Sequence, residues 1–75
     1  MNESIEMRLV FSGNVQGVGF RASAAQLAKQ LLVTGTIQNL SDGTVEAVIQ
    51  GDHEKLYQFA LLLENKFNCH AMSEI

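Results

Sequence analysis

Hydrophobic and polar residues alternate along the first stretch of the chain. Between positions 5 and 12 the odd positions are apolar and the even positions mostly polar, which predicts a β-strand with one apolar face. Three glycines then follow within seven positions and predict a loop after the strand. The apolar face consists of Ile5, Met7, Leu9 and Phe11, and the glycines are Gly13, Gly17 and Gly19.

Two later segments have apolar residues spaced three and four apart, which is the period of an amphipathic helix. The first segment begins at Phe20, and Gly35 is expected to end it. The second begins after Asp52, a residue type that favours the N-cap of a helix. Each helix therefore has one face to bury. The two stripes consist of Phe20, Ala24, Leu27, Ala28 and Leu31, and of Leu56, Phe59, Ala60, Leu63 and Phe67.

Two further strands are predicted between the helices, at residues 36–40 and 44–50, with a hairpin turn at residues 41–43. Residues 71–75 predict a short last strand. The order is strand, helix, strand, strand, helix, strand. Because each helix offers a single apolar face, both should cover one face of a mainly antiparallel sheet, the split β-α-β arrangement of α+β proteins.

This arrangement brings three parts of the sequence to one edge of the sheet. A right-handed β-α-β crossover leaves the first and second strands pointing the same way, so their carboxyl ends lie together. The loop leaves the first strand at that edge, and Asn39 lies near the end of the second. The first helix starts there too, with Arg21 in its first turn. We therefore expect the loop, Arg21 and Asn39 to converge.

Length and composition indicate one small domain that spans residues 1–75. The apolar fraction of 47% is that of a globular protein, and no run is long and apolar enough for a membrane span. A single Cys69 excludes an intrachain disulfide, and the start does not resemble a signal peptide, so a cytoplasmic location is expected. The net charge of −3 argues against a nucleic-acid surface. An anion would have to be captured by local geometry.

The chemistry that the loop indicates is anion binding. Residues 13–21 read GNVQGVGFR, in which glycines let backbone N–H groups point into one concavity. The first turn of the following helix adds unpaired N–H groups and the positive end of its dipole. The forked guanidinium of Arg21 can bind two oxygens of a phosphoryl group. By themselves, however, these residues favour a simpler interpretation, a plain turn with a solvated Arg21, because such a loop is a weak signal.

Asn39 also has two interpretations. An asparagine before a hairpin is usually a turn former, and by itself this is the simpler interpretation. Its amide can also accept a hydrogen bond from a water and donate one to an oxyanion, which suits the placement of a nucleophilic water. Cys69 and His70 are neighbours, but no further cluster of Cys or His completes a zinc site, so no metal is expected.

Two motifs, taken together, resemble those of the acylphosphatase family. Residues 13–21 are similar to the family's signature loop, and residues 35–46, GTIQNLSDGTVE, are similar to its second motif. They occur in order, with the first helix between them, and the resemblance covers residues 7–51 well. It implies a ferredoxin-like α/β sandwich that hydrolyses the carboxyl–phosphate bond of acylphosphates without a metal or other cofactor. It also reverses the two simpler interpretations given above.

The resemblance implies a role for each site residue. Arg21 binds the phosphate together with backbone N–H groups of the loop, Asn39 orients the nucleophilic water, and the substrate itself takes the proton of that water. The chain departs from the family at Thr36, where a bulky aromatic is usual, and it ends before a typical member would. We therefore expect the last strand to be short or missing. The phosphate-binding loop consists of Gln16, Gly17, Val18, Gly19, Phe20 and Arg21.

Two alternatives to an enzyme are considered. Acylphosphatase-like domains also occur as accessory parts of carbamoyl-transfer proteins, so the chain could bind phosphate or carbamoyl phosphate without turnover. An RNA-binding sheet shares the strand order, but residues 44–50 contain no aromatic on which a base could stack. The expected partner is a small acylphosphate or inorganic phosphate, with no nucleic acid and no membrane. A monomer is expected, with pairing of an open sheet edge between two copies as the alternative.

Overall fold

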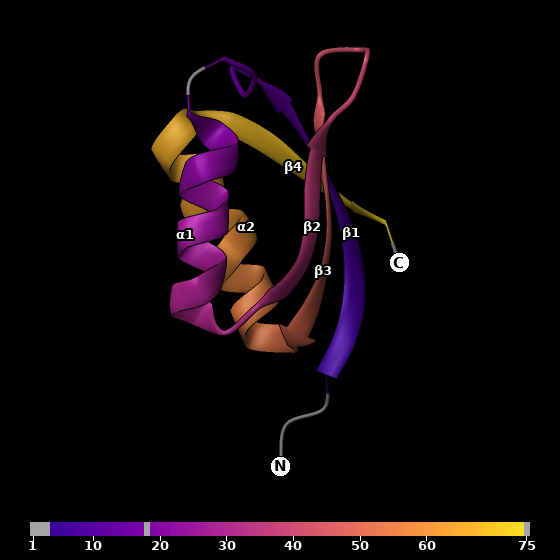
Figure 1. The fold of residues 1–75 in the computed structure, drawn as a ribbon, viewed down its shortest axis with the longest axis vertical. Helices are drawn as coiled ribbons and strands as arrows, with labels where there is room; N and C mark the ends of the chain where they lie inside the picture. The colour runs from indigo at the N-terminus through magenta and orange to yellow at the C-terminus, as the bar shows by residue number, and fades with distance from the viewer. Residues whose placement is uncertain (1–3, 18, 75) are drawn as a thin grey trace.

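The computed structural model describes residues 4–17 and 19–74. Its elements follow the predicted order along the chain (Figure 1). They are β1 (Ser4–Gly13), α1 (Phe20–Leu31), β2 (Thr34–Asn39), β3 (Val45–Asp52), α2 (His53–Phe67) and β4 (Cys69–Glu74). Neither helix in these residues is long and apolar enough to cross a membrane.

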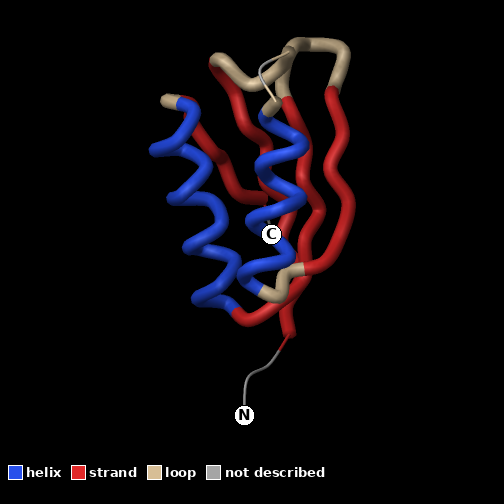
Figure 2. Tube along the Cα trace, turned by 60° about the vertical axis from the view of Figure 1, so that its left-hand side comes forward, coloured by secondary structure: helices blue, strands red, loops and turns tan. Residues whose placement is uncertain are grey.

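The strands of the described residues form one sheet in the order β2-β3-β1-β4, and every neighbouring pair is antiparallel. β1 and β2 lie on either side of β3, so they run in the same direction, as expected for a β-α-β crossover. Both helices cover the same face of the sheet (Figures 1 and 2). This arrangement confirms the predicted α+β fold.

The core lies between the sheet and the two helices. Along β1 and β3 every second side chain is buried, and the apolar stripes of α1 and α2 pack against them, as the spacing predicts. Phe11 links the two layers, with its ring centre 5.0 Å from that of Phe20 on α1 and 6.5 Å from that of Phe59 on α2. The buried residues are Met7, Leu9, Phe11, Val15, Phe20, Ala24, Val33, Val45, Ala47, Ile49, Leu56, Phe59 and Leu63.

Gly35 does not end α1, so this expectation from the sequence is wrong. The helix ends at Leu31, and Leu32 takes the left-handed position after it, at φ 60°. Gly35 lies inside β2 opposite Ile49, where a Cβ would stand 2.0 Å from the carbonyl oxygen of Val48. The close approach of β2 to β3 and a φ of 144° therefore require glycine at this position.

The last strand, expected to be short or missing, is present. β4 has six residues, pairs with β1 along its whole length, and begins two residues before position 71. It follows Asn68, which ends α2 in a left-handed conformation at φ 53°. The amide of Ala71 donates to Oε2 of Glu64 at 2.7 Å, which fixes β4 against α2. The predicted end of this strand, Ile75, lies outside the described residues.

The face of the sheet away from the helices carries an ion-pair network. Arg8 on β1 donates to the carboxylates of Glu46 on β3 and Glu74 on β4. Gln38 on β2 donates to Glu46 at 2.9 Å. The hydrogen bond from Gln38, followed by the one from Arg8, holds the pKa of Glu46 below its ordinary value. The network joins all the strands of the described sheet and leaves the helix face free for the core.

Candidate active site

Three parts of the chain meet at one end of the molecule, as the topology predicts. β1 and β2 end there and α1 begins there (Figure 1). The loop that joins β1 to α1 therefore lies at the same end as the turn that joins β2 to β3 (Figure 2). Hydrogen bonds connect the loop to the turn, so the two segments are in contact.

Two buried side chains fix the ends of the loop between β1 and α1. Val15 is 1% exposed, and its amide donates to the carbonyl of Gly13 at 3.0 Å. Phe20, also 1% exposed, begins α1, and its ring centre lies 5.0 Å from those of Phe11 and Phe67. The described loop residues between these anchors are exposed. The loop is therefore fixed by these two anchors, and Gln16, Gly17 and Gly19 between them are open to solvent.

The N-terminus of α1 lacks the usual partners for its amides. Gly19 is the N-cap, in a left-handed conformation at φ 79° that favours glycine, and no side chain caps the helix. The first hydrogen bond of the helix runs from the amide of Ser23 to the carbonyl of Gly19, at 3.0 Å. The amides of Phe20, Arg21 and Ala22 precede it and have no partner within the helix. No acidic residue lies in the first turn.

A pocket of about 220 Å³ lies at this N-terminus and contains the two main residues predicted from the sequence. Arg21 comes from the first turn of α1, and Asn39 is the last residue of β2. Both are exposed, so they are accessible to a ligand. The site therefore combines a forked cation, helix amides without a partner inside the helix, and a side-chain amide. Its walls are formed by Val15, Gly17, Gly19, Phe20, Arg21, Ala22 and Asn39.

The turn after Asn39 is closed by hydrogen bonds of its own. The amide of Leu40 donates to the carbonyl of Thr44 at 2.8 Å, and the amide of Gly43 donates back to Leu40 at 3.2 Å. Asp42 accepts from the amide of Thr44 at 3.0 Å and from its hydroxyl at 2.6 Å. These two bonds hold the pKa of Asp42 below its ordinary value. These hydrogen bonds give the turn that follows Asn39 a fixed conformation.

The structure separates the residues of the predicted phosphate loop. Gly17, Gly19, Phe20 and Arg21 line the pocket, whereas Gln16 does not. The side chain of Gln16 instead donates to carbonyls of the β2–β3 turn. Val18 lies outside the described residues. The sequence interpretation did not include Val15 and Ala22, which also line the pocket; their places beside the glycines and Arg21 were the only available signal.

The residues weighed for a metal site do not form one. Among the described residues, no group of three His, Cys, Asp or Glu side chains could hold a metal ion. Sγ of Cys69 lies 3.6 Å from the carbonyl oxygen of Leu63, and partial burial raises the pKa of this thiol. Nδ1 of His70 lies 3.8 Å from Oε2 of Glu64. These contacts support the junction between α2 and β4.

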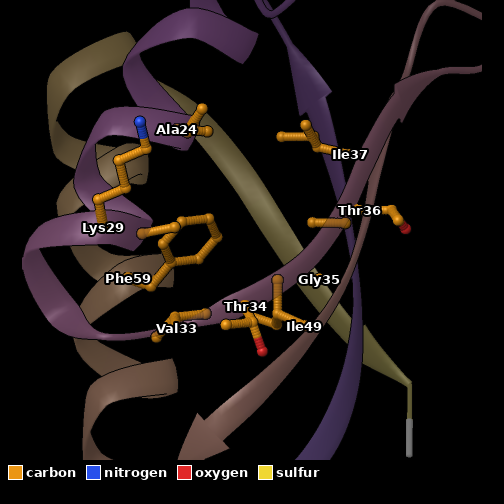
Figure 3. Close-up of a pocket in the computed structure, with 12 residues that line it drawn as sticks. Ala24, Lys29, Val33, Thr34, Gly35, Thr36, Ile37, Ile49 and Phe59 are labelled. Carbon is orange, nitrogen blue, oxygen red and sulfur yellow. The ribbon is translucent and has the colours of Figure 1, made fainter.

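A second cavity, of about 290 Å³, lies between α1 and β2 (Figure 3). Its walls are mainly apolar side chains of α1, β2 and β3, and Phe59 reaches into it from α2. Thr36, where the resemblance leads one to expect a bulky aromatic, is an exposed part of its lining. The cavity contains none of the predicted site residues, so the candidate chemistry lies in the pocket at the N-terminus of α1.

The family model described as Acylphosphatase matches residues 7–75. The chain belongs to the acylphosphatase family. An acylphosphatase of Legionella pneumophila (strain Corby) is 47% identical over 64 residues, which are 85% of this chain and 70% of that protein. One of Picrophilus torridus is 55% identical over 47 residues, which are 63% of this chain and 58% of that protein.

Solved acylphosphatase structures share the fold of this chain. The structure of an acylphosphatase from Coxiella burnetii matches with a TM-score of 0.81 at 30% identity. The match covers 99% of this chain and 83% of that chain. The structure of the acylphosphatase from Bacillus subtilis matches with a TM-score of 0.79 at 28% identity. The match covers 92% of this chain and 83% of that chain. The ferredoxin-like α+β fold is therefore confirmed, and the chain matches part of the length of these relatives.

Proposed function

We propose that the chain hydrolyses acylphosphates to a carboxylate and inorganic phosphate in the pocket at the N-terminus of α1. The observation that carries this proposal is the position of Arg21 and Asn39 on the walls of one pocket, beside helix amides that no acidic side chain neutralises. Membership of the acylphosphatase family supports the same reaction. The sections of chain that carry both motifs lie within the matched residues 7–75.

The phosphoryl group is bound by Arg21 and by backbone amides of the loop from Gln16 to Phe20, Val18 included. The guanidinium offers two donors in the geometry that two phosphoryl oxygens require. The helix dipole adds positive potential at the same place. Each charge-assisted hydrogen bond contributes about 1.5–3 kcal/mol, so a few of them can hold a small dianion. The negative charge of the whole protein makes this local arrangement necessary.

The reaction is the transfer of the phosphoryl group to water. The side-chain oxygen of Asn39 accepts a hydrogen bond from the water and directs the water oxygen at phosphorus. A bond forms between these atoms, and the bond from phosphorus to the acyl oxygen breaks, so the carboxylate leaves with the electron pair. An acylphosphate dianion and water thus give a carboxylate, a hydrogen phosphate dianion and a proton. A phosphoryl oxygen of the substrate takes the first proton from the water.

The proposed catalysis consists of positioning and charge stabilisation. A carboxylate is a good leaving group, so the transition state needs little covalent help from the protein. Holding the water in line with the phosphoryl group can remove a large part of the barrier. No general base from the protein and no metal or other cofactor takes part in the scheme. Activity should therefore persist in a chelator.

The proposal extends to the oligomeric state, the partner and the location of the protein. Arg21 and Asn39 both come from one chain, so we propose that a monomer is active, with pairing through the exposed edge of β2 as the alternative. The expected partner is a small acylphosphate, and neither nucleic acid nor a membrane is needed. A cytoplasmic location is compatible with the reduced, partly buried thiol of Cys69.

Hydrolysis of benzoyl phosphate with EDTA present tests the proposed function. The wild-type chain, shown to be folded by circular dichroism, should release benzoate and phosphate well above the rate without protein. A binding assay with inorganic phosphate on the same sample separates the enzyme from the alternative. A folded chain that binds phosphate without turnover would instead be a phosphate- or carbamoyl-phosphate-binding domain.

A further inference from the structure

Gln16 lies in the anion-binding loop, but its side chain does not line the pocket. Its Nε2 donates to the carbonyl of Leu40 at 3.1 Å and to the carbonyl of Thr44 at 2.9 Å. Both acceptors belong to the turn that follows Asn39. The side chain therefore crosses from the segment that would bind the phosphate to the segment that would hold the water.

The two acceptors are the carbonyls that also close the turn. The carbonyl of Leu40 accepts from the amide of Gly43, and the carbonyl of Thr44 accepts from the amide of Leu40. Each carbonyl has two lone pairs, so the amide of Gln16 uses the remaining acceptor capacity without disturbing the turn. One side chain thus binds the residues at the start and at the end of the turn, Leu40 and Thr44. These two hydrogen bonds fix the position of the turn relative to the loop.

This connection is the direct hydrogen-bonded link between the two halves of the site. Within the described parts of the loop and the turn, every hydrogen bond that joins one to the other comes from Nε2 of Gln16. The loop itself is held against the core by Val15 and Phe20, which belong to the β1–α1 side. Asn39 belongs to β2, which pairs only with β3 in the sheet. The sheet joins β2 to β1 only through β3, so the bonds from Gln16 are the direct contact that holds the loop against the turn beside Asn39.

We propose that Gln16 is a positioning residue that sets the distance between the anion-binding loop and Asn39. This inference rests on the proposed function, since it assigns the water to Asn39. The side chain of Gln16 acts on the β2–β3 turn and does not contact the substrate, whatever its backbone amide contributes to anion binding. Loss of this side chain should lower the rate of hydrolysis although it does not take part in the reaction, because a misplacement of about 1 Å at a reacting group can cost roughly 100-fold in rate.

The variants Gln16→Leu and Gln16→Asn test the proposal in the benzoyl phosphate assay with EDTA. Leucine keeps most of the volume and removes both hydrogen bonds, and asparagine keeps the amide but is one methylene too short to reach the turn. Both should lower kcat by roughly tenfold, part of the loss that a full ångström of misplacement causes. The Kd for inorganic phosphate should change by less than about threefold, because Arg21 and the loop amides stay on their own anchors. Gln58→Leu, the same change at an exposed position of α2, is the matched control and should behave as wild type.

A double-mutant cycle with Asn39→Ala distinguishes positioning from a general structural role. Once the water-directing amide is absent, its position no longer matters, so adding Gln16→Leu to Asn39→Ala should change kcat by less than about twofold. A merely destabilising change would lower kcat in both backgrounds. Circular dichroism of each variant establishes that the comparison is made between folded proteins.

The outcomes separate this proposal from the proposed function. Wild type without turnover would overturn the proposed function and the role of Gln16 together. An active wild type with Gln16→Leu and Gln16→Asn equal to Gln58→Leu would overturn the role of Gln16 alone. Loss of phosphate binding in parallel with kcat, or full additivity with Asn39→Ala, would also overturn it. A loss of kcat that phosphate binding does not share and that vanishes in the Asn39→Ala background would support it.

Discussion

The two helices of the molecule begin with opposite arrangements of charge. α2 starts after Asp52, has Glu54 in its first turn, and has Lys66 in its last turn. These charges complement the helix dipole. α1 starts after Gly19, has no acidic residue in its first turn, and has Arg21 there instead. The first arrangement is what stability alone favours, and the second leaves the positive end of a helix dipole open beside a cation.

Under the proposed function, the difference marks an exchange of helix stability for anion binding at the N-terminus of α1. An acidic side chain near a helix N-terminus stabilises it by about 0.3–1 kcal/mol, and α1 lacks this contribution. The missing negative charge can be supplied by a bound phosphoryl group, which the pocket at this position would admit. At the N-terminus of α2 the chain provides the charge itself. The following experiments alter the N-terminus of α1, or Asn39 and the turn that follows it, in order of decreasing expected effect.

Removing the cation of α1 should have the largest effect. Arg21→Ala removes two charge-assisted hydrogen bonds of about 1.5–3 kcal/mol each, so kcat/KM should fall by roughly 100- to 10,000-fold. Phosphate binding should fall with it, as measured by isothermal titration calorimetry. Lys55→Ala removes an exposed cation near the start of α2 and is the matched control. Equal effects of the two substitutions would mean that the charge of Arg21 acts only on the general field of the protein.

Removing the side chain of Asn39 should lower turnover while phosphate binding is kept. Asn39→Ala should lower kcat by roughly 100- to 1,000-fold, the usual cost of losing one group that stabilises the transition state. The Kd for inorganic phosphate should stay within about threefold of wild type, because the anion partners are on α1 and its loop. Asn65→Ala, at an exposed position of α2, controls for the loss of an amide elsewhere. Near-normal turnover of Asn39→Ala would show that another group directs the water.

An acid placed in the first turn of α1 should make its N-terminus resemble that of α2. Ala22→Glu should raise Tm slightly through the dipole. It should also weaken phosphate binding by roughly tenfold relative to Ala22→Gln, because like charges about 4 Å apart repel by about 1 to 4 kcal/mol near a protein surface. The glutamine variant has the same size without the charge. Tighter phosphate binding by Ala22→Glu would contradict an anion site at this helix end.

The smallest effect concerns the turn that supports Asn39. The hydrogen bonds from Thr44 lower the pKa of Asp42 in the folded protein, so the ionised carboxylate contributes stability above its ordinary value of 3.8. This contribution should be lost as the pH falls below 3.8 through the lower pKa of the folded state. The Tm difference between wild type and Asp42→Asn should therefore be positive at pH 6 and shrink below about pH 3.8. A difference that does not depend on pH would show that the charge of Asp42 has no role in the turn.

Much of the fold could be predicted because burial imposes a period on the sequence. The alternation in β1 and the helical stripes of α1 and α2 have direct counterparts in the core. The convergence of Arg21 and Asn39 could also be predicted, because the direction of β1 and β2 fixes which ends of the strands meet. These features depend on the spacing of apolar residues and on the order of the elements, and both can be read from a single sequence.

The features that could not be predicted depend on contacts between distant segments. Gly35 reads as the end of a helix, and only the approach of β2 to β3 shows that a Cβ there would meet the carbonyl of Val48. Gln16 reads as one more loop residue, and its bonds to Leu40 and Thr44 exist only because the loop and the turn meet. The left-handed residue after α1 is Leu32, a type that does not signal such a position.

The central claim, that α1 and not α2 presents the anion site, is tested most directly by titrating the ¹⁵N-labelled protein with inorganic phosphate. Two-dimensional ¹H–¹⁵N spectra report each backbone amide separately. We expect saturable shifts at Gly17, Gly19, Phe20, Arg21 and Ala22, and none beyond the general effect of salt at the first turn of α2. Shifts of equal size at the two helix ends, or shifts confined to α2, would contradict the account.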